Sequence, residues 1–538
     1  MKTHFLFISA ENDAIYNCKA GGMADVVRDV PREISKRGDM VSVVTPSYNR
    51  LHLNQKLISE IGFNFRGRTQ IAQLYEVIPK RPDLNISHYV IHHPEITSGD
   101  IAQIYHHDVA EPFFADANIF VLFNTALASA IVKGVFGKID IVHLHDWHTS
   151  PILILKEYHN EYKPLKNIFF TYTIHNLAIQ GIRPFENNYS SLKAWYPDIN
   201  IDYDTLADPV YSDCINLMAI GIRLADTIHT VSPSYKEDIL KPSKRPLFIG
   251  GEGLEKDLAN ADKEGRLFGI LNGCNYTNIR EAEKGHLYIR TIKALFEWLQ
   301  QPHKKYKSDF LIHTGAKVSR YLDISPPDFV CGSVSRLTEQ KFLFFKKSPE
   351  ILINILQKLQ PVNGVFILLG SGVPDYEELF REISYTHENF FFINGQSEDV
   401  IDSLYVESDL FIMPSLFEPC GISQMLAMRN GQPCLVHSTG GLKDTVDHLK
   451  TGFCFNGKTY KEKTSNFIKV FDLALDMFFN DKPKWNNISS KAKEQRFTWG
   501  KSVDLYYANL YKIIRENTVE KSYRKQRIKN KTQSEILS

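Results

Sequence analysis

Short runs of β-branched and aromatic residues alternate with longer stretches of helical periodicity along most of the chain. Strands that alternate with helices are typical of a parallel sheet with right-handed crossovers. The first half is therefore expected to form an α/β domain. Its strand-like runs are HFLFISA, MVSVVTPSY, IDIVHLHD, NIFFTYTIH and TIHTVSPSY.

The same alternation begins again after residue 325, which predicts a second α/β domain. The region between the halves, residues 274–327, is charged and irregular, and we interpret it as a linker with an insertion. A chain of 538 residues is too long for one hydrophobic core, so two or three domains are expected. The strand-like runs of the second half are DFVCGSVSRL, GVFILLGSG, NFFFING, DLFIMPS and QPCLVHSTGG.

The longest apolar segment, residues 119–136, includes polar residues such as Asn124 and Lys133. A membrane span needs about 20 apolar residues, so this segment predicts a buried helix. The apolar run at the N-terminus ends at Glu11 and is too short for a signal peptide, so we interpret it as a first strand. These observations favour a cytoplasmic protein.

The composition is that of an ordinary globular protein, with 43% hydrophobic and 23% charged residues. The net charge of +1 gives no reason to expect nucleic acid or a membrane surface as a partner. Seven cysteines include no CxxC pair, which favours buried thiols in a reducing compartment over disulfides.

Polar or glycine-rich turns follow strand after strand, and open parallel sheets bind ligands at the carboxyl ends of their strands. The first such turn holds Lys19, Gly21 and Gly22 before a long helical pattern. Two glycines at a helix start let backbone amides approach an anion, and lysine adds a charge for phosphate. A glycine turn beside a solvated lysine would give the same pattern.

Arg336 and Lys341 stand five residues apart, just after a strand of the second half. Arginine offers a planar fork for phosphate oxygens and lysine a compact charge, so together they could stabilise a departing diphosphate. Two unrelated surface cations are the alternative.

Histidines gather in two turns of the first half. His175 ends an apolar strand, where it could be an acid or base, a metal ligand, a sugar-hydroxyl partner or a core residue. His143 and His145 share one strand face, but no thiol or further ligand motif follows nearby, so no metal site is expected. Asp146 and His148 come next, in what we interpret as a substrate-facing turn.

Glu418 lies in the turn FEPCGIS, between a strand and a helical pattern, and STGGLKDTV offers another glycine pair at a helix start. A carboxylate does not help to bind phosphate. It can accept hydrogen bonds from sugar hydroxyls or favour positive charge on a sugar ring. We therefore expect this turn to offer an acid to a sugar and backbone amides to phosphates.

Taken together, these motifs resemble the glycogen/starch synthase family of retaining glycosyltransferases with the GT-B fold. The likeness covers residues 3–273 and 328–512. It rests on KAGGMADVV, VHLHDWHT, TIHNLAIQG, ADTIHTVSPSY, GILNG, SRLTEQK, GSGVPDYEE and FEPCGISQMLAMRNGQP with STGGLKDTV, in that order.

The resemblance implies two Rossmann-like α/β domains facing each other across a cleft. The nucleotide-sugar donor would bind mainly to the C-terminal domain and an α-glucan acceptor to the N-terminal one. The implied reaction moves glucose from a nucleotide sugar, ADP-glucose, to the non-reducing end of an α-1,4-glucan with retention. No metal or other cofactor is expected.

The family's roles are carried over to matching positions of this chain. The acid Glu418 would contact the transferring glucose, while His175 and Asp146 would line the sugar pocket. Arg336 and Lys341 would hold the diphosphate. The remaining donor-side positions are Lys19, Gly21, Gly22, Tyr105, Asn272, Cys420, Gly421, Ile422 and Ser423.

Several positions depart from the family pattern. Ala20 replaces a threonine, the segment from Glu11 to Lys19 is two residues longer than usual, and Phe342 replaces a glycine. The hinge motif becomes NGCNYTNI, and an insertion of about 25 residues precedes Asp328.

The expected division of the chain ends in a helix that crosses back to the N-terminal domain and a basic tail. The tail lacks a core-forming pattern and is expected to be disordered and solvated, with polyanion binding as the alternative. The ranges are 1–268 for the N-terminal domain, 269–327 for hinge and insertion, 328–500 for the C-terminal domain, 501–520 for the helix and 521–538 for the tail.

Two other functions remain open. One is a related GT-B transferase with another donor or acceptor, and the other is a non-catalytic glucan-binding paralogue. The joint presence of Lys19, His175, Arg336, Lys341 and Glu418 argues against a non-catalytic protein. Phosphorolysis is disfavoured because no pyridoxal-phosphate lysine motif is recognisable.

Overall fold

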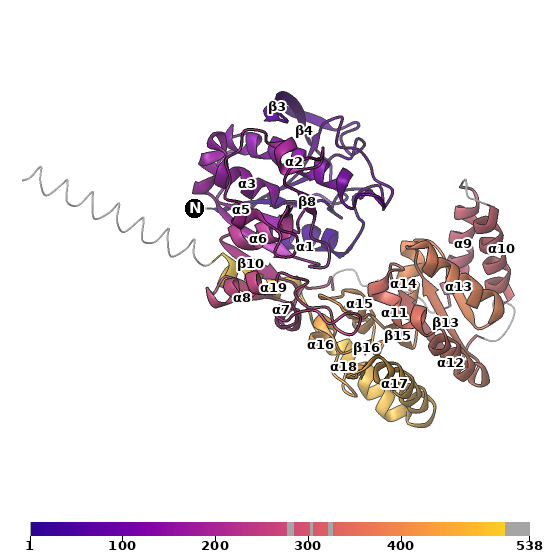
Figure 1. The fold of residues 1–538 in the computed structure, drawn as a ribbon. Helices are drawn as coiled ribbons and strands as arrows, with labels where there is room; N and C mark the ends of the chain where they lie inside the picture. The colour runs from indigo at the N-terminus through magenta and orange to yellow at the C-terminus, as the bar shows by residue number, and fades with distance from the viewer. Residues whose placement is uncertain (1, 277–284, 302–304, 321–325, 512–538) are drawn as a thin grey trace, which may run out of the picture. The chain divides into compact units, whose positions relative to one another are not determined.

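The structure is a computed structural model in which the chain forms two compact units (Figure 1). It describes residues 2–276, 285–301, 305–320 and 326–511. Within these, unit 1 comprises residues 2–243, 250–272 and 499–511, and unit 2 comprises residues 244–249 and 273–498.

Unit 1 is built on a nine-stranded sheet, counted over the described residues, in the order β11-β10-β7-β6-β1-β2-β5-β4-β3. The strands predicted in this half are all present as β1, β2, β6, β7 and β10. Strand pairs are parallel except β3–β4 and β4–β5. The sheet contains His4–Ile8 (β1), Met40–Pro46 (β2), Lys56–Phe65 (β3), Arg68–Glu76 (β4), Ile86–His92 (β5), Ile141–His145 (β6), Phe169–Ile174 (β7), Thr227–Thr230 (β10) and Leu267–Gly269 (β11).

The antiparallel part of this sheet corrects the expectation of a purely parallel one. β3 and β4 form a hairpin joined by Arg66 and Gly67, whose φ angles of 55° and 67° are both positive. Such a two-residue turn matches the twist of paired strands. The sequence of β3 alternates polar and apolar residues and has no continuous apolar run, so it was not predicted.

The long apolar helix of unit 1 is α2, Phe114–Val132, and it is the one described helix long and apolar enough to cross a membrane. Of its most apolar window, 83% is buried inside the protein, which confirms the prediction of a buried core helix. The other helical segments are Gly22–Lys36 (α1), Pro151–Tyr158 (α3), Asn160–Asn167 (η1), Leu192–Trp195 (α4), Tyr203–Leu206 (α5), Leu217–Leu224 (α6), Pro233–Ile239 (α7) and Glu255–Lys263 (α8). Ile182–Pro184 (β8) and Cys214–Asn216 (β9) form a small two-stranded antiparallel sheet.

The last described residues pack on unit 1. Trp499–Leu505 (α19) continues into a π-helical turn, Tyr506–Leu510. Tyr507 donates a hydrogen bond to Asp39 (2.6 Å), and the ring of Tyr511 lies 5.0 Å from that of Phe5. The tail predicted for residues 521–538 lies outside the described residues.

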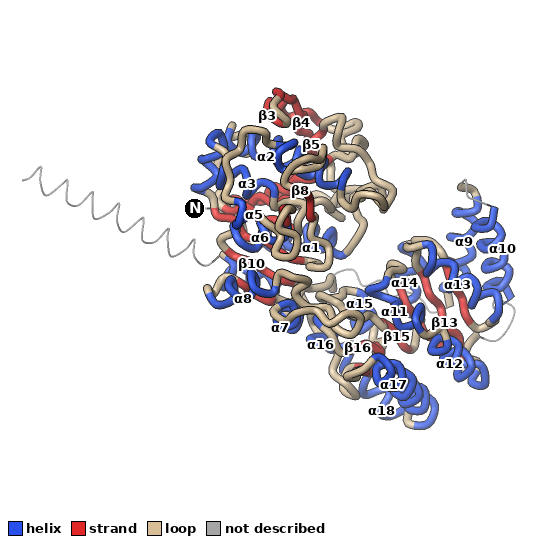
Figure 2. Tube along the Cα trace, viewed as in Figure 1, coloured by secondary structure: helices blue, strands red, loops and turns tan. Residues whose placement is uncertain are grey.

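Unit 2 holds a six-stranded parallel sheet, in red in Figure 2, in the order β14-β13-β12-β15-β16-β17. Numbered along the chain, this is the order 3-2-1-4-5-6 of a doubly wound nucleotide-binding fold. The predicted strands all occur, and β17 is added to them. Their bounds are Phe329–Val334 (β12), Gly364–Leu369 (β13), Phe390–Ile393 (β14), Leu410–Met413 (β15), Cys434–His437 (β16) and Gly452–Phe455 (β17).

The region interpreted as irregular contains two helices, Leu287–Leu299 (α9) and Lys305–Arg320 (α10). In α9 the buried residues Leu287, Thr291, Ala294 and Leu295 recur at helical spacing, so one face packs on the sheet. The apolar positions form helical faces although the segment is rich in charge. The other helical segments are Glu339–Lys347 (α11), Glu350–Leu359 (α12), Gln360–Val362 (η2), Pro374–Thr386 (α13), Glu398–Glu407 (α14), Ser423–Arg429 (α15), Gly440–Thr445 (α16), Tyr460–Asn480 (α17) and Lys482–Glu494 (α18).

Candidate active site

The two candidate loops of unit 2 leave neighbouring strands at the point where the strand order reverses. β12 pairs with β13 on one side and with β15 on the other. The loop after β12 carries Arg336, the helix that follows it, α11, carries Lys341 in its first turn, and the loop after β15 carries Glu418. In open α/β sheets, ligands bind outside the carboxyl ends of the strands at this switch point.

Lys341 of α11 and Glu418 of the loop after β15 form an ion pair, with a direct contact between Nζ and Oε2. The side chain of Lys341 is 18% exposed and that of Glu418 only 7%. Ser415 donates a second hydrogen bond to the carboxylate (3.1 Å). Glu418 has no basic residue beside it along the chain, and the fold supplies one from α11, 77 residues away.

The turn around Glu418 lies directly against the start of α16. The amide of Gly441 donates to the carbonyl of Glu418 (3.0 Å). A Cβ on Gly440 would lie 2.0 Å from that carbonyl oxygen, and one on Gly441 would lie 2.4 Å from the Cα of Cys420. Only glycine permits this approach, so both glycines set the position of the turn.

Inside the turn, Gly421 has a φ of 73°, which favours glycine. The side-chain amide of Gln424 donates to the carbonyls of Cys420 (3.1 Å) and Gly421 (2.8 Å). Ile422 and Ser423 follow at the start of the short helix α15. The conformation of the turn is therefore set by its own contacts.

Arg336 is exposed, and its guanidinium makes no ion pair with any residue that the structure describes. Nearby, Phe342 stands where the family has glycine, and its φ of −130° is open to any residue. Its ring is buried and lies 5.2 Å from that of Phe380. The departure at this position is thus accommodated by packing.

In unit 1, the corresponding switch point lies at β1, which pairs with β2 and with β6. Asp146 follows β6, is buried, and accepts hydrogen bonds through Oδ1 from the amides of His175 (2.7 Å) and Asn176 (3.4 Å). Burial raises the pKa of Asp146 to about 7, against the lowering effect of the two amides. Asp146 and His175, both predicted to line the sugar pocket, are therefore joined by a hydrogen bond.

The amides expected to bind an anion at the start of α1 already have an internal acceptor. Oε2 of the buried Glu11 accepts from Ala20 (2.7 Å) and Gly21 (2.5 Å), and the hydroxyl of Tyr105 donates to its Oε1 (2.8 Å). Glu11 is not among the site residues predicted from the sequence. Its place at the end of the first strand, shortly before the glycine pair, is the signal that could have shown it.

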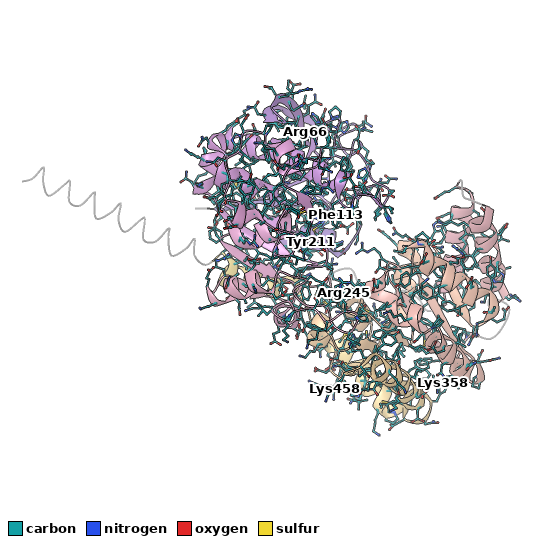
Figure 3. The ribbon with its side chains drawn as sticks, viewed as in Figure 1. Arg66, Phe113, Tyr211, Arg245, Lys358 and Lys458 are labelled. Carbon is teal, nitrogen blue, oxygen red and sulfur yellow. The ribbon has the colours of Figure 1, made fainter. Side chains whose placement is uncertain are left out.

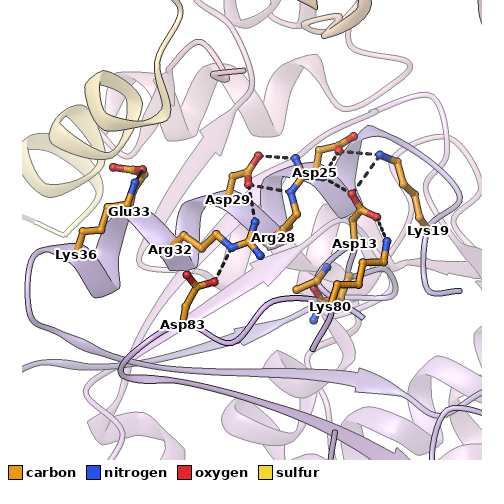
Figure 4. Close-up of polar contacts among 12 residues, drawn as sticks. Asp13, Lys19, Asp25, Arg28, Asp29, Arg32, Glu33, Lys36, Lys80 and Asp83 are labelled. Carbon is orange, nitrogen blue, oxygen red and sulfur yellow. Dashed lines mark hydrogen bonds and ion pairs between the residues drawn. The ribbon is translucent and has the colours of Figure 1, made fainter. Parts of the chain in front are cut away.

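Lys19 belongs to a network of charges on α1 and its preceding loop (Figure 4). Its Nζ lies 2.7 Å from Asp25 and 3.4 Å from Asp13, and Asp13 also pairs with Lys80 (2.7 Å) and Arg28. The predicted donor-binding cation thus has two carboxylate partners, and its side chain is 44% exposed. Gly22 begins α1 beside it.

The histidines of the H-x-H run share one face, as predicted, with the rings of His143 and His145 stacked at 4.6 Å. Burial lowers the pKa of His143, His145 and His175 well below 6.5, so all three are neutral near pH 7. Among the described residues, no group of three or more His, Cys, Asp or Glu side chains is placed to hold a metal ion.

Asn272 follows β11 at the end of unit 1 and is buried. Its amide donates to the carbonyl of Val231 (3.3 Å), and its Oδ1 has no hydrogen-bond partner among the described residues. The structure brings no other candidate residue into hydrogen-bond contact with it. Hydrogen bonds and ion pairs thus join Asp146 to His175 in unit 1 and Lys341 to Glu418 in unit 2.

Comparisons with known proteins match both halves of the chain. A family model described as starch synthase catalytic domain matches residues 4–260, and one described as glycosyl transferases group 1 matches residues 330–494. A glycogen synthase of Streptococcus sanguinis is 32% identical over 525 residues, which cover 95% of this chain and 99% of that protein. The chain belongs to the glycogen/starch synthase family. The resemblance stated from the motifs is confirmed.

Other relatives agree with this membership. A glycogen synthase of Exiguobacterium sibiricum is 29% identical over 94% of this chain and 98% of its own length. The starch synthase IV catalytic domain of Arabidopsis thaliana matches in structure with a TM-score of 0.73 and 23% identity, over 95% of this chain and 99% of that chain. This likeness confirms the GT-B fold with its two Rossmann-like domains. As a family member, the chain is a glycosyltransferase.

Proposed function

We propose that the protein transfers glucose from ADP-glucose to the non-reducing end of an α-1,4-glucan, with retention at the anomeric carbon, in the cytoplasm. Unit 2 is the donor side and unit 1 the acceptor side. The observation that carries the proposal is the pairing of Lys341 with Glu418 at the switch point of unit 2. The carboxyl edge of the sheet there presents Lys341 as a cation for a diphosphate and Glu418 as an acid for a sugar.

In unit 2, Arg336 and Lys341 bind the diphosphate of the donor. Arginine supplies a planar fork and lysine a point charge, and both stabilise the negative charge that grows on the leaving group. Glu418 accepts hydrogen bonds from hydroxyls of the transferred glucose. The backbone of residues 420–423 contributes amides to phosphate and ribose, with the turn fixed by its glycines.

In unit 1, His175 and Asp146 line the sugar pocket, together with Tyr105 and Asn272. Lys19 contacts the donor, with Gly21 and Gly22 behind it. Asp25 and Asp13 orient the Lys19 ammonium until a phosphate competes for it.

The bond changes balance without a cofactor. The bond between the anomeric carbon and the β-phosphate oxygen breaks, and the diphosphate leaves with the electron pair. A bond forms from the same face to the terminal 4-hydroxyl oxygen of the glucan, which loses its proton to the departing diphosphate or to solvent. Exclusion of water keeps the donor from being hydrolysed.

The choice of donor rests on a structural relative. The Arabidopsis starch synthase IV domain was solved bound to ADP and acarbose. Calorimetric titrations with ADP-glucose and with UDP-glucose test this choice for the present chain. Tighter binding of ADP-glucose supports it, and tighter binding of UDP-glucose contradicts the donor while leaving the transferase class intact.

The transfer itself is tested by the release of ADP from ADP-glucose in the presence of glycogen. Arg336→Ala and Glu418→Gln are each expected to lower kcat/KM by at least about 100-fold, since each removes an interaction made with developing charge or with the sugar. Arg320→Ala is the matched control, because this exposed arginine on α10 pairs with Glu388 at the surface (3.1 Å). Unchanged rates in both site variants would show the assigned roles to be wrong.

A further inference from the structure

His175, which the proposed function places in the sugar pocket, is in hydrogen-bond contact with His145. Nδ1 of His145 lies 2.9 Å from Nε2 of His175, and the two rings are stacked at 5.2 Å. His145 is fully buried, whereas His175 is partly exposed. Since both rings are neutral, one nitrogen of this pair donates the proton and the other accepts it.

The positions of the protons on the neighbouring residues His229 and Thr173 follow from their hydrogen bonds. Nε2 of His229 lies 3.1 Å from the carbonyl oxygen of Ile270, which can only accept, so this nitrogen carries the proton. Nδ1 of the neutral His229 ring is then an acceptor, and the hydroxyl of Thr173 donates to it (3.1 Å).

The same reasoning extends along the chain of hydrogen bonds. Because the proton of Thr173 is committed to His229, its oxygen accepts from Nε2 of His143 (2.7 Å). Nδ1 of His143 is therefore unprotonated and accepts from the hydroxyl of Tyr511 (2.9 Å). Both nitrogens of His143 are thus occupied, and this ring, stacked on His145 at 4.6 Å, offers His145 no acceptor.

The remaining nitrogen of His145, Nε2, is buried and has no hydrogen-bond partner among the described residues. If it carried the proton, a buried N–H group would be left without an acceptor, which folded proteins rarely tolerate. If it carries none, only a lone pair is unpaired. The second arrangement is favoured, and it places the proton of His145 on Nδ1, facing His175.

We propose that His145 is a positioning residue that donates to Nε2 of His175 and so holds His175 as the tautomer with its proton on Nδ1. His175 then presents a hydrogen-bond donor, not an acceptor, to a sugar oxygen. The tautomer of a histidine is set by the hydrogen bond that its other nitrogen makes. The proposal rests on the proposed function only for the identity of the sugar, because the tautomer is a property of the chain itself.

The direct test is nitrogen NMR of the full chain labelled with ¹⁵N-histidine. A His175→Asn variant assigns the His175 ring by the loss of its signals. The expected spectrum has both rings protonated at Nδ1 and bare at Nε2: His145 donates from its Nδ1, and Nε2 of His175 accepts. A proton on Nε2 of His175 would overturn the proposal, whether or not the protein transfers glucose.

Kinetics give the second readout through a matched pair of variants. His145→Asn keeps an N–H group close to the position of Nδ1, whereas His145→Phe keeps the stacked ring and removes the donor. His145→Phe is expected to lower kcat about tenfold or more, and His145→Asn is expected to restore most of that loss. Equal activity of the two variants, with equal melting temperatures, would contradict the donor role.

The two tests separate the inference from the proposed function. If the wild-type protein releases no ADP from ADP-glucose, the proposed function fails. The NMR measurement still decides the tautomer in that case. If transfer occurs but His175 carries its proton on Nε2, the function stands and the positioning role of His145 is wrong.

Discussion

Asp146 is a buried acid whose behaviour with pH differs from that of a surface carboxylate. Burial raises the pKa of its carboxyl group to about 7 in the folded chain, from about 3.8 in the unfolded chain. Between these two values the folded chain holds a proton that the unfolded chain has released. The contribution of this group to stability is therefore present at low pH and is lost as the pH rises toward 7.

Replacing Asp146 with asparagine removes this dependence. Between about pH 5 and pH 8, the wild type should lose about 2–3 kcal/mol of unfolding free energy that Asp146→Asn does not lose. Asparagine can still accept from the amides of His175 and Asn176, so the turn is kept. Urea unfolding of both proteins at the two pH values measures the difference. An equal change in unfolding free energy between the two pH values for both proteins would show that the pKa of Asp146 is not raised by folding.

The ion pair of Lys341 and Glu418 has little access to water. A buried charge left without its partner is costly, whereas removal of both charges together is often nearly neutral. The pair is therefore expected to hold the Glu418 turn against α11 as well as to serve the donor. This role can be separated from catalysis by stability measurements alone.

Lys341→Met should destabilise the protein by about 3 kcal/mol, because it leaves the Glu418 carboxylate with Ser415 as its remaining partner among the described residues. Combining it with Glu418→Gln should recover most of the loss. Lys358→Met is the control: Lys358, labelled in Figure 3, pairs at the surface with Asp472 (2.6 Å) and should cost less than about 1 kcal/mol. Urea unfolding measures the free energy of unfolding of Lys341→Met, of the double variant and of Lys358→Met. A double variant that is less stable than Lys341→Met alone would contradict the expected coupling of the two charges.

At the residue scale, the sequence located the candidate residues but not their partners. Strand ends could be read from apolar runs, so residues such as Glu418 and Asp146 could be placed at the carboxyl edge of a sheet. The hydrogen-bond and ion-pair partners of these residues depend on which strands become neighbours in the sheet, and this order cannot be predicted from a single sequence. The hydrogen bonds that Glu11 accepts from the amides of Ala20 and Gly21 are an example of contacts that could not be predicted in this way.

Among the elements, α16 depends most clearly on glycine. Gly440 has a φ of 44°, and a side chain there would meet the carbonyl oxygen of Glu418. Gly315 in the middle of α10 has ordinary helical surroundings, and an added Cβ would lie 3.9 Å from Leu295. The two positions give opposite expectations for the same substitution.

Gly440→Ala should therefore cost at least about 2 kcal/mol and displace the Glu418 turn. Gly315→Ala should be neutral or stabilise the protein by up to about 1 kcal/mol, since alanine is the better helix former. Thermal unfolding of the two variants beside the wild type is the measurement. A lower melting temperature for Gly315→Ala than for Gly440→Ala would show that the turn is not tightly packed.

The elements that sequence reasoning found are those with continuous apolar runs. The parallel strands of both units are buried on both faces of their sheets, so their sequences are continuously apolar, and α2 is buried on nearly all sides. The hairpin of β3 and β4 is half-exposed, and α9 carries charges on its outer face, so both lack that signal. Their structure depends on a two-residue turn and on one apolar stripe.

At the scale of the whole molecule, each unit has its own sheet and its own switch point, and each switch point carries one group of candidate residues. The group in unit 1 offers buried neutral histidines and an acid of raised pKa, which suit a sugar. The group in unit 2 offers a cation, Lys341, beside the acid Glu418, which suits a sugar diphosphate. This division of chemistry matches the proposed division into acceptor and donor sides.

The central claim is that the chain makes a new glycosidic bond with retention. Proton NMR of a malto-oligosaccharide incubated with ADP-glucose and the enzyme tests it most directly, because the anomeric coupling reports the configuration and the chemical shift reports the linkage. The account predicts growth of an α-1,4 anomeric signal in step with ADP release. Free glucose alone, a β-linked product, or binding of the glucan without any turnover of the donor would contradict it.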